Sequence, residues 1–134
     1  MTKLTVIEGI GDTYADKLKA AGVKTCEGLL EAGATKKGRD QIVKDSKISA
    51  SLILKFVNHA DLCRIKGVAG EYAELLEAAG VDTVPELAQR NAANLTAKMT
   101  EVNAKKKLVR QLPSESRVTD WVKQAKKLKR VISH

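Results

Sequence analysis

The sequence has few of the residue types on which many binding and catalytic sites depend. Its 134 residues include two cysteines, two prolines and four aromatic side chains. The low proline and glycine content argues against a disordered or low-complexity chain. No stretch approaches the roughly 18 apolar residues that a membrane span needs. The N-terminus has no long apolar core and no small-residue cleavage site, so we expect a cytoplasmic protein without membrane contact.

Other absences narrow the range of functions. Cys26 and Cys63 form no CxxC motif and, taken with His59, fit no metal-ligand spacing, so we expect reduced cysteines and no metal. The motifs GxxxxGKS/T, HExxH and GxSxG do not occur. We therefore expect that the protein is not an enzyme and has no cofactor and no small-molecule substrate. With so few aromatic residues, we expect no stacking platform for single-stranded nucleic acid.

The chain contains an internal repeat. Residues 7–30, IEGIGDTYADKLKAAGVKTCEGLL, align without gaps to residues 65–88, IKGVAGEYAELLEAAGVDTVPELA, with eleven identical pairs among 24. Residues 48–60 resemble residues 113–125 more weakly. No Gly-, Ser- or Pro-rich linker separates the repeats. We therefore predict two units, residues 1–62 and 63–134, packed as one compact body. The aromatic residues that the repeat pairs are expected in the cores: Tyr14 with Tyr72, and Phe56 with Trp121.

The composition predicts helices throughout, and hence an all-α fold. Alanine, leucine and lysine recur, and no two-residue alternation of apolar and polar residues is sustained. Residues 12–21 and 71–79 are predicted helices that end at Gly22 and Gly80. Three further helices are predicted to begin at the capping residues Ser49, Thr83 and Ser114. The apolar stripe predicted for the last helix consists of Val118, Trp121, Val122, Ala125 and Leu128.

Each repeat begins with a glycine motif of the form apolar–x–Gly–apolar–Gly–x–x–x–Ala–x–x–apolar. The first copy reads Ile7-Glu8-Gly9-Ile10-Gly11-Asp12-Thr13-Tyr14-Ala15-Asp16-Lys17-Leu18. This pattern, followed by GVKTCEGLL, resembles the helix-hairpin-helix motif. Each unit resembles the small SAM-like helical domains that carry two such hairpins, as in the N-terminal domain of strand-exchange recombinases. The whole tandem resembles an uncharacterised bacterial family built from two of these units.

The motif has a physical basis for binding phosphate. Glycines permit the left-handed dihedral angles of a tight turn, and the helix that follows begins with free backbone N–H groups. Contacts from these groups are independent of base sequence, and a nearby lysine adds counterion release. In the first copy, Gly9, Ile10 and Gly11 form the turn, and Lys17 lies about one turn into the helix. Asp12, however, is expected at the mouth of this site, where its charge would repel phosphate.

The second copy meets the same requirements less well. Ala69 replaces the second glycine, and Glu71 and Leu75 stand where the first copy has Thr13 and Lys17. We therefore do not assign phosphate binding to the second turn. A glycine turn of this kind also simply joins two helices, so an architectural role stays open for both copies.

The net charge of +8 is unevenly distributed. Residues 1–34 and 65–92, which hold the glycine motifs, carry net charges of −1 and −3, whereas residues 35–64 and 93–134 carry +4 and +8. The last helix is therefore a second candidate contact for nucleic acid, through the regularly spaced residues Lys123, Lys126, Lys127 and Arg130. Folding could also bring cations close to the first turn from the segment that contains Lys36, Lys37 and Arg39. The alternative is a solvated basic face that keeps the protein soluble.

Two functions fit these features. The first is a non-catalytic, sequence-independent nucleic-acid-binding module, with DNA as the expected polymer, that grips backbone phosphates through residues 9–11 and its basic helices. The second is a protein–protein interaction adaptor or self-associating scaffold, which the acidic motif segments and the degenerate second copy favour. Only phosphate binding predicts an affinity that falls steeply as the salt concentration rises.

Overall fold

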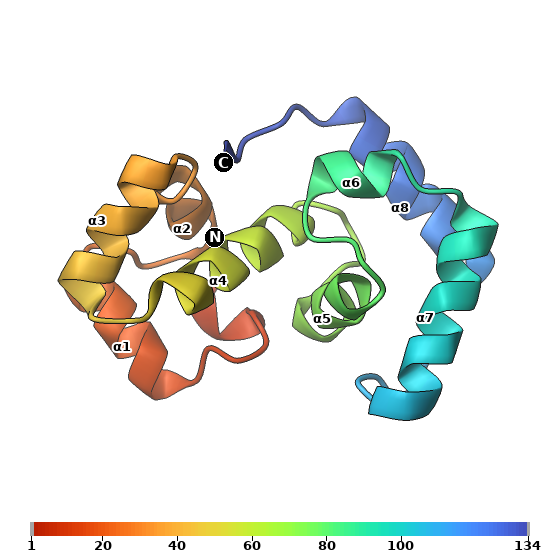
Figure 1. Cartoon of the computed structure of the whole chain (residues 1–134), viewed down its shortest axis with the longest axis horizontal. Coiled ribbons are helices and arrows are strands. Elements are labelled where there is room, and N and C mark those ends of the chain that lie inside the picture. The colour runs from red at the N-terminus through yellow and green to blue at the C-terminus, as the bar shows by residue number, and fades with distance from the viewer. Residues whose placement is uncertain (1, 134) are drawn as a thin grey trace. The chain divides into compact units, whose positions relative to one another are not determined.

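The computed structural model describes residues 2–133, and these residues form helices joined by turns, which confirms the all-α prediction. The elements in chain order are η1 (Leu4–Val6), α1 (Asp12–Ala20), α2 (Cys26–Ala32), α3 (Lys36–Ser46), α4 (Ala50–Leu62), α5 (Gly70–Ala78), α6 (Val84–Ala88), α7 (Ala92–Lys106) and α8 (Glu115–Lys127). Figure 1 shows them in chain order. Within the described residues, no helix combines the length and the apolar character required to cross a membrane. Nor does the same part of the chain bring together three or more His, Cys, Asp or Glu residues that could hold a metal ion.

The chain forms two units, each with its own apolar core. The first contains residues 2–61 together with 130–133, and the second contains residues 62–129. Elements η1 to α4 thus build the first unit and α5 to α8 the second (Figure 1). The division predicted from the sequence differs in the last residues, which pack with the first unit instead of the second. The physical reason is Ile132, whose side chain is buried in the core of the first unit.

The aromatic residues show that the two repeats fold alike. In the first unit, the ring centres of Tyr14 and Phe56 lie 5.7 Å apart at an interplanar angle of 58°. In the second unit, the rings of Tyr72 and Trp121 lie 5.4 Å apart at 53°. These are the pairs that the repeat alignment equates, and a tilted arrangement is a favourable one for aromatic rings. The predicted core positions of Phe56 and Trp121 are confirmed, since each is 1% exposed.

Side-chain caps begin most of the helices. Four capping residues each accept a hydrogen bond from the backbone amide three residues further on: Thr25 at α2, Thr35 at α3, Asn91 at α7 and Ser114 at α8. Ser49 accepts one from Leu52 N at 3.4 Å, as predicted for α4. The cap predicted at α6 is wrong in detail, because Thr83 accepts no such bond and its hydroxyl donates to Glu86 Oε1 at 3.1 Å. Caps of this kind satisfy amides that would otherwise lack a partner.

The last helix is shorter than the sequence predicted. α8 ends at Lys127, and the backbone is extended at Leu128. The prediction that Leu128 belongs to the buried stripe is therefore wrong, since this residue is 36% exposed. Arg130 was predicted to continue the basic face of the helix, and it lies instead in the segment that packs with the first unit. α8 ends at Lys127 because the residues that follow lead to Ile132, which is buried in the core of the first unit.

Candidate functional site

The first candidate site is the turn that leads into α1. Ile10 N donates to Ile7 O at 3.1 Å, which closes a tight turn with Gly9 at φ +92°. An L side chain is strained at this φ, so the turn favours glycine. Gly9 and Gly11 are exposed, which leaves the turn open to solvent. Ile10 lies between them with a side chain only 3% exposed, so it contributes to the core and its amide is already used within the turn.

The start of α1 is also open. The helical hydrogen bonds begin with Ala15 N, which donates to Gly11 O at 2.9 Å, so the amides of Asp12, Thr13 and Tyr14 precede this series. No side chain caps them, because the N-cap residue is Gly11. A Cβ atom added at Gly11 would meet nothing within 4 Å. Uncapped amides at a helix N-terminus carry a positive partial charge that suits an anion.

Charged side chains surround the α1 turn. Lys17 is exposed, and its Nζ lies 5.8 Å from the centre of the Tyr14 ring. Tyr14 packs on Phe56, and a Cβ added at Gly9 would lie 3.5 Å from that same Phe56 ring. The lysine is therefore held over an aromatic pair that also supports the turn. Asp12 lines a hollow beside α1 together with three lysines, so cations lie near its negative charge.

The second turn has the same backbone geometry. Val68 N donates to Ile65 O at 3.1 Å, and Gly67 has φ +96°. Ala69 is the N-cap residue of α5 and makes no side-chain cap. The first helical bond runs from Ala73 N to Ala69 O at 2.9 Å, so the preceding amides of α5 are uncapped as they are in α1. The helix start therefore lacks a side-chain cap although alanine replaces glycine at position 69, but it is less open than that of α1, because its first residue, Gly70, is buried whereas Asp12 is exposed.

Helix α8 holds the second turn in place. The side chain of Gln124 bonds to both backbone groups of Lys66: its Oε1 accepts from the amide at 2.9 Å, and its Nε2 donates to the carbonyl at 3.1 Å. The same Nε2 donates to Asp120 Oδ2 at 2.8 Å, one helical turn earlier. A two-point contact of this kind fixes the direction of the backbone as well as its position.

Sequence reasoning did not identify Arg117 as a candidate site residue. Its Nη2 donates to Gly67 O at 3.5 Å, and its guanidinium carbon lies 5.3 Å from the Tyr72 ring centre and 5.7 Å from that of Trp121. These are cation–π distances. Arg117 is exposed, so its charge is available to solvent at the second turn. The sequence offered one signal for this role, because Arg117 lies one helical turn before Trp121. The repeat alignment gave no signal, because it pairs Arg117 with an uncharged residue, Leu52.

A further basic segment is anchored at the start of α5. The hydroxyl of Tyr72 donates to Gln111 O at 3.0 Å. The amide side chain of Asn103 makes two bonds to the backbone of Val109, at 3.0 and 3.1 Å. Arg110 lies between these two anchored residues and is exposed. The connection from α7 to α8 therefore has a defined conformation and carries an exposed cation, Arg110.

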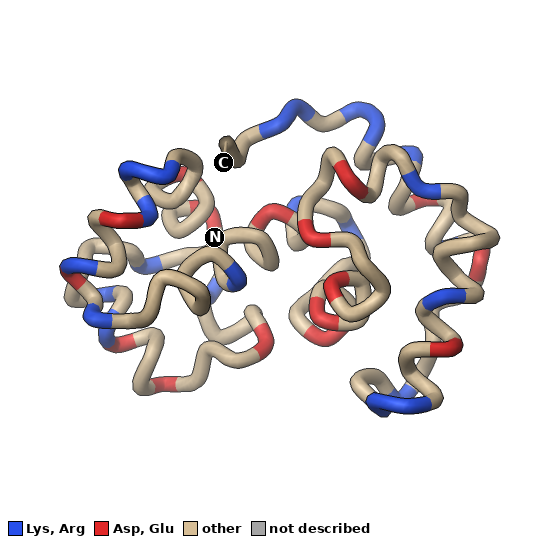
Figure 2. The backbone as a smooth tube through the Cα atoms, viewed as in Figure 1, with Lys and Arg blue, Asp and Glu red and all other residues tan. Residues whose placement is uncertain are grey.

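The lysines predicted on α8 lie on its solvent side. Lys123, Lys126 and Lys127 are all exposed, whereas Trp121 and Val122 are buried. Lys123 and Lys127 are four residues apart and therefore share one face of the helix. Figure 2 shows basic residues at intervals along α8 and at the end of α7. The predicted contact residues thus fall into two groups, with the α1 turn and Lys17 in the first unit and the α8 lysines in the second.

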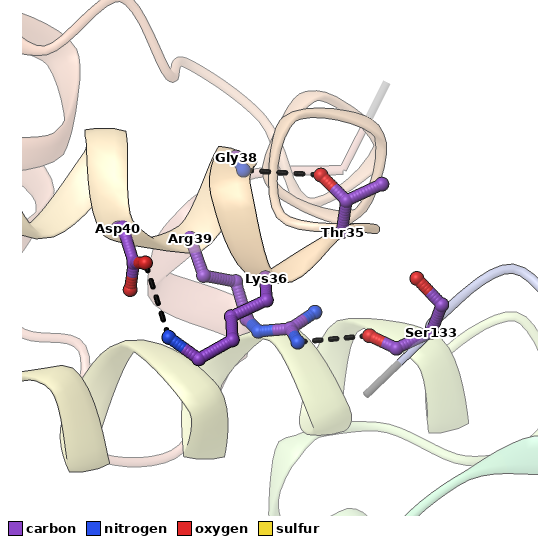
Figure 3. A network of polar contacts seen from close by, with 6 residues as sticks. All are labelled: Thr35, Lys36, Gly38, Arg39, Asp40 and Ser133. Carbon is purple, nitrogen blue, oxygen red and sulfur yellow. Dashed lines mark hydrogen bonds and ion pairs between the residues drawn. The ribbon is translucent and has the colours of Figure 1, made fainter.

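Two of the basic residues at the start of α3, Lys36 and Arg39, make contacts within the first unit. Arg39 is buried, and its guanidinium donates to Gly33 O at 2.8 Å and Ala34 O at 3.3 Å. It also donates to Ser133 O at 2.8 Å (Figure 3). Ser133 N in turn donates to Ala34 O at 2.7 Å. Lys36 forms an ion pair with Asp40 at 3.2 Å. Of the cations that folding could have brought to the first glycine turn, Arg39 instead anchors the C-terminal segment.

No curated protein and no solved structure matches the chain. A protein family described as Domain of unknown function (DUF4332) matches residues 8–128. This range includes both glycine turns and helices α1 to α8. Because the match extends over most of its residues, the chain belongs to the DUF4332 family.

Proposed function

We propose that the protein is a non-catalytic, sequence-independent nucleic-acid-binding module, with DNA as the expected polymer. The observation that carries this proposal is the contrast between its helix starts. α1 and α5, which follow the glycine turns, lack a side-chain cap, whereas α2, α3, α7 and α8 have one. A capping oxygen occupies the amides that a phosphate would use. The short helix α6 also lacks this bond, but Glu86 places a carboxylate at its start.

The two turns have the features expected of helix-hairpin-helix turns. Each has a glycine at positive φ, a closing hydrogen bond and an α-helix without a side-chain cap directly after it. Both turns have this backbone geometry although their sequences differ at the second glycine of the motif. The recurrence favours a role that the two turns share. At the second turn, the exposed Arg117 supplies a cation beside Gly67.

Binding through these groups would be independent of base sequence. Backbone amides and lysine side chains contact phosphate oxygens, which are the same at every nucleotide. Phe56 and Trp121 are buried, and Tyr14 and Tyr72 are half-buried against them, so no fully exposed ring is available to stack on an unpaired base. This arrangement favours the backbone of a duplex over a single strand.

A salt titration with a duplex of random sequence tests the proposal. For a protein that neutralises phosphates, the logarithm of the affinity falls linearly with the logarithm of the salt concentration, with a slope of about −0.9 per phosphate. We expect the triple variant Lys123→Glu/Lys126→Glu/Lys127→Glu to lose retention of the duplex. The matched control is Lys36→Glu/Lys37→Glu/Lys44→Glu, which changes the net charge equally in the first unit.

The outcomes separate the possibilities. Wild-type protein that retains no duplex even at low salt would refute the proposed function. If the α8 variant and the control lose affinity equally, net charge alone explains binding and α8 is not a contact surface. Folding of every variant is checked by its helical circular dichroism, because these lysines are exposed and their replacement should leave the core intact.

A further inference from the structure

A hollow in the first unit lies beside α1. Most of the residues that line it are outside the glycine motif. Its volume is about 330 Å³. The residues that line it are Lys3, Leu4, Thr5, Asp12, Ala15, Lys19 and Lys24. Three of these are cationic and only Asp12 is acidic, so the charged side chains of the hollow sum to +2. A surface depression with this surplus of ammonium groups suits a phosphate.

Several contacts fix the segment before η1, which forms one side of the hollow. Lys3 pairs with Thr25 in an isolated β-bridge, and Lys3 O accepts a hydrogen bond from the Cys26 thiol at 3.3 Å. Thr2 N donates to Glu27 Oε1 at 2.9 Å, and this backbone hydrogen bond is the main cause of the lowered pKa of Glu27. The backbone that presents Lys3 is therefore held against the start of α2.

The other two lysines are placed by the end of α1. Lys19 lies in the last turn of this helix. Gly22, at φ +87°, then reverses the chain, with its amide donating to Lys19 O at 3.0 Å. Lys24 follows Gly22 by two residues and directly precedes Thr25, the partner of Lys3 in the bridge. Three separate backbone segments therefore bring one lysine each to the same hollow.

We infer that this hollow binds one phosphate group of a nucleic-acid strand, next to the phosphate held by the amides of α1. The inference rests on the proposed function and deepens it. Asp12 belongs to both phosphate positions, because its amide is the first in α1 and the residue also lines the hollow. A strand carries phosphates in regular succession, so adjoining anion sites suit a polymer. The carboxylate of Asp12 opposes the bound phosphate and moderates its affinity.

Replacing the three lysines tests the inference. The variant is Lys3→Gln/Lys19→Gln/Lys24→Gln, and the control is Lys36→Gln/Lys37→Gln/Lys44→Gln, which removes equal charge from α3 of the same unit. Loss of one phosphate contact should make the salt slope about 0.9 less steep than in the control. That slope difference corresponds to about eightfold weaker duplex binding at 0.1 M salt, with the gap closing towards 1 M.

A second pair of variants examines Asp12 itself. Asp12→Asn and Asp16→Asn each remove one negative charge from α1, and both residues are exposed. If the hollow holds a phosphate, Asp12→Asn strengthens duplex binding more than Asp16→Asn does. Equal effects would mean that Asp12 does not face the bound strand.

The failure of this inference can be distinguished from failure of the proposed function. Absence of salt-dependent binding in the wild type refutes the proposed function. A steep wild-type slope, with equal slopes for the lysine variant and its control, overturns the phosphate site alone. Inorganic phosphate is titrated separately and followed by backbone amide chemical shifts. Shifts at the hollow with phosphate, but none there with duplex, would overturn the assignment to a strand.

Discussion

Gly11 is the position at which the proposed phosphate site can be closed without disturbing the fold. Its backbone is extended, with φ −88° and ψ −172°, and an added Cβ would meet nothing within 4 Å. A serine there has the geometry of an ordinary N-cap residue. Its hydroxyl would accept a hydrogen bond from one of the first amides of α1, as Thr25 accepts one from Gly28 N at 3.0 Å at the start of α2.

The expected magnitudes follow from this geometry. Exchanging glycine for serine at an N-cap stabilises a helix by only a few tenths of a kcal/mol. Replacing glycine at a compatible position adds about 0.4–1 kcal/mol by restricting the unfolded chain. Gly11→Ser should therefore raise the free energy of unfolding by about 1 kcal/mol. Gly11→Ala leaves the amides open and should not stabilise the protein, because alanine is a poorer N-cap residue than glycine, and it is therefore the matched control for binding.

Urea unfolding and duplex binding at 0.1 M salt are measured on the same set of variants. We expect Gly11→Ser and Gly11→Asp to be more stable than the wild type and to bind duplex more weakly, with the charged aspartate weakest. Gly11→Ala should bind like the wild type. Stabilised Ser and Asp variants with unchanged binding would refute the use of these amides. In the second turn, Ala69→Asp should weaken binding less than Gly11→Asp does, and equal losses would mean that the two turns contribute alike.

Three further predictions concern stability and reactivity. Gly67→Ala should destabilise more than Gly9→Ala in urea unfolding, because both are strained at positive φ but only the Cβ at position 67 lies 3.0 Å from Trp121 Nε1; equal losses would contradict this reasoning. Ile132→Ala should cost about 2–5 kcal/mol, since the side chain is 2% exposed, and a loss well below 1 kcal/mol would mean that the C-terminal segment does not complete the first core. Burial raises the pKa of Cys63 to about 11, so its thiol should react slowly with iodoacetamide at pH 9. Its contribution to stability should also fall as the pH rises from about 9 to about 11, which Cys63→Ala would abolish, and rapid labelling of the native protein would contradict the half-buried position.

The features that the sequence predicted correctly depend on local signals. Gly22 and Gly80 end α1 and α5 in left-handed conformations, at φ +87° and +95°. Ser114 begins α8 through the bond from Arg117 N that its side chain accepts at 3.2 Å. Such caps and turns are decided by a few neighbouring residues, so the helix starts and the repeat are readable without knowledge of distant contacts.

The features that the sequence missed depend on contacts between distant residues. Arg117 is brought to the second turn by packing of α8, 50 residues further along the chain than Gly67. The end of α8 is determined by Ile132 and by the bond from Arg39 to Ser133 O, which joins residues 94 positions apart. Helical periodicity favours continuation of α8 through Arg130, but burial of Ile132 outweighs one further turn of an exposed basic helix.

The surroundings of α8 distinguish two ways of contributing charge. Arg117 is held by Gly67 O and two aromatic rings, so its cation has a defined direction at the second turn. Lys123 and Lys127 lie on the solvent face and can act through counterion release at any point along a polyanion. A salt slope counts both kinds of contact, whereas a capping substitution such as Gly11→Ser removes only a contact made by fixed amides. A protein that binds only through a basic surface would therefore respond to charge reversal on α8 and not to the cap, whereas a built phosphate site responds to both.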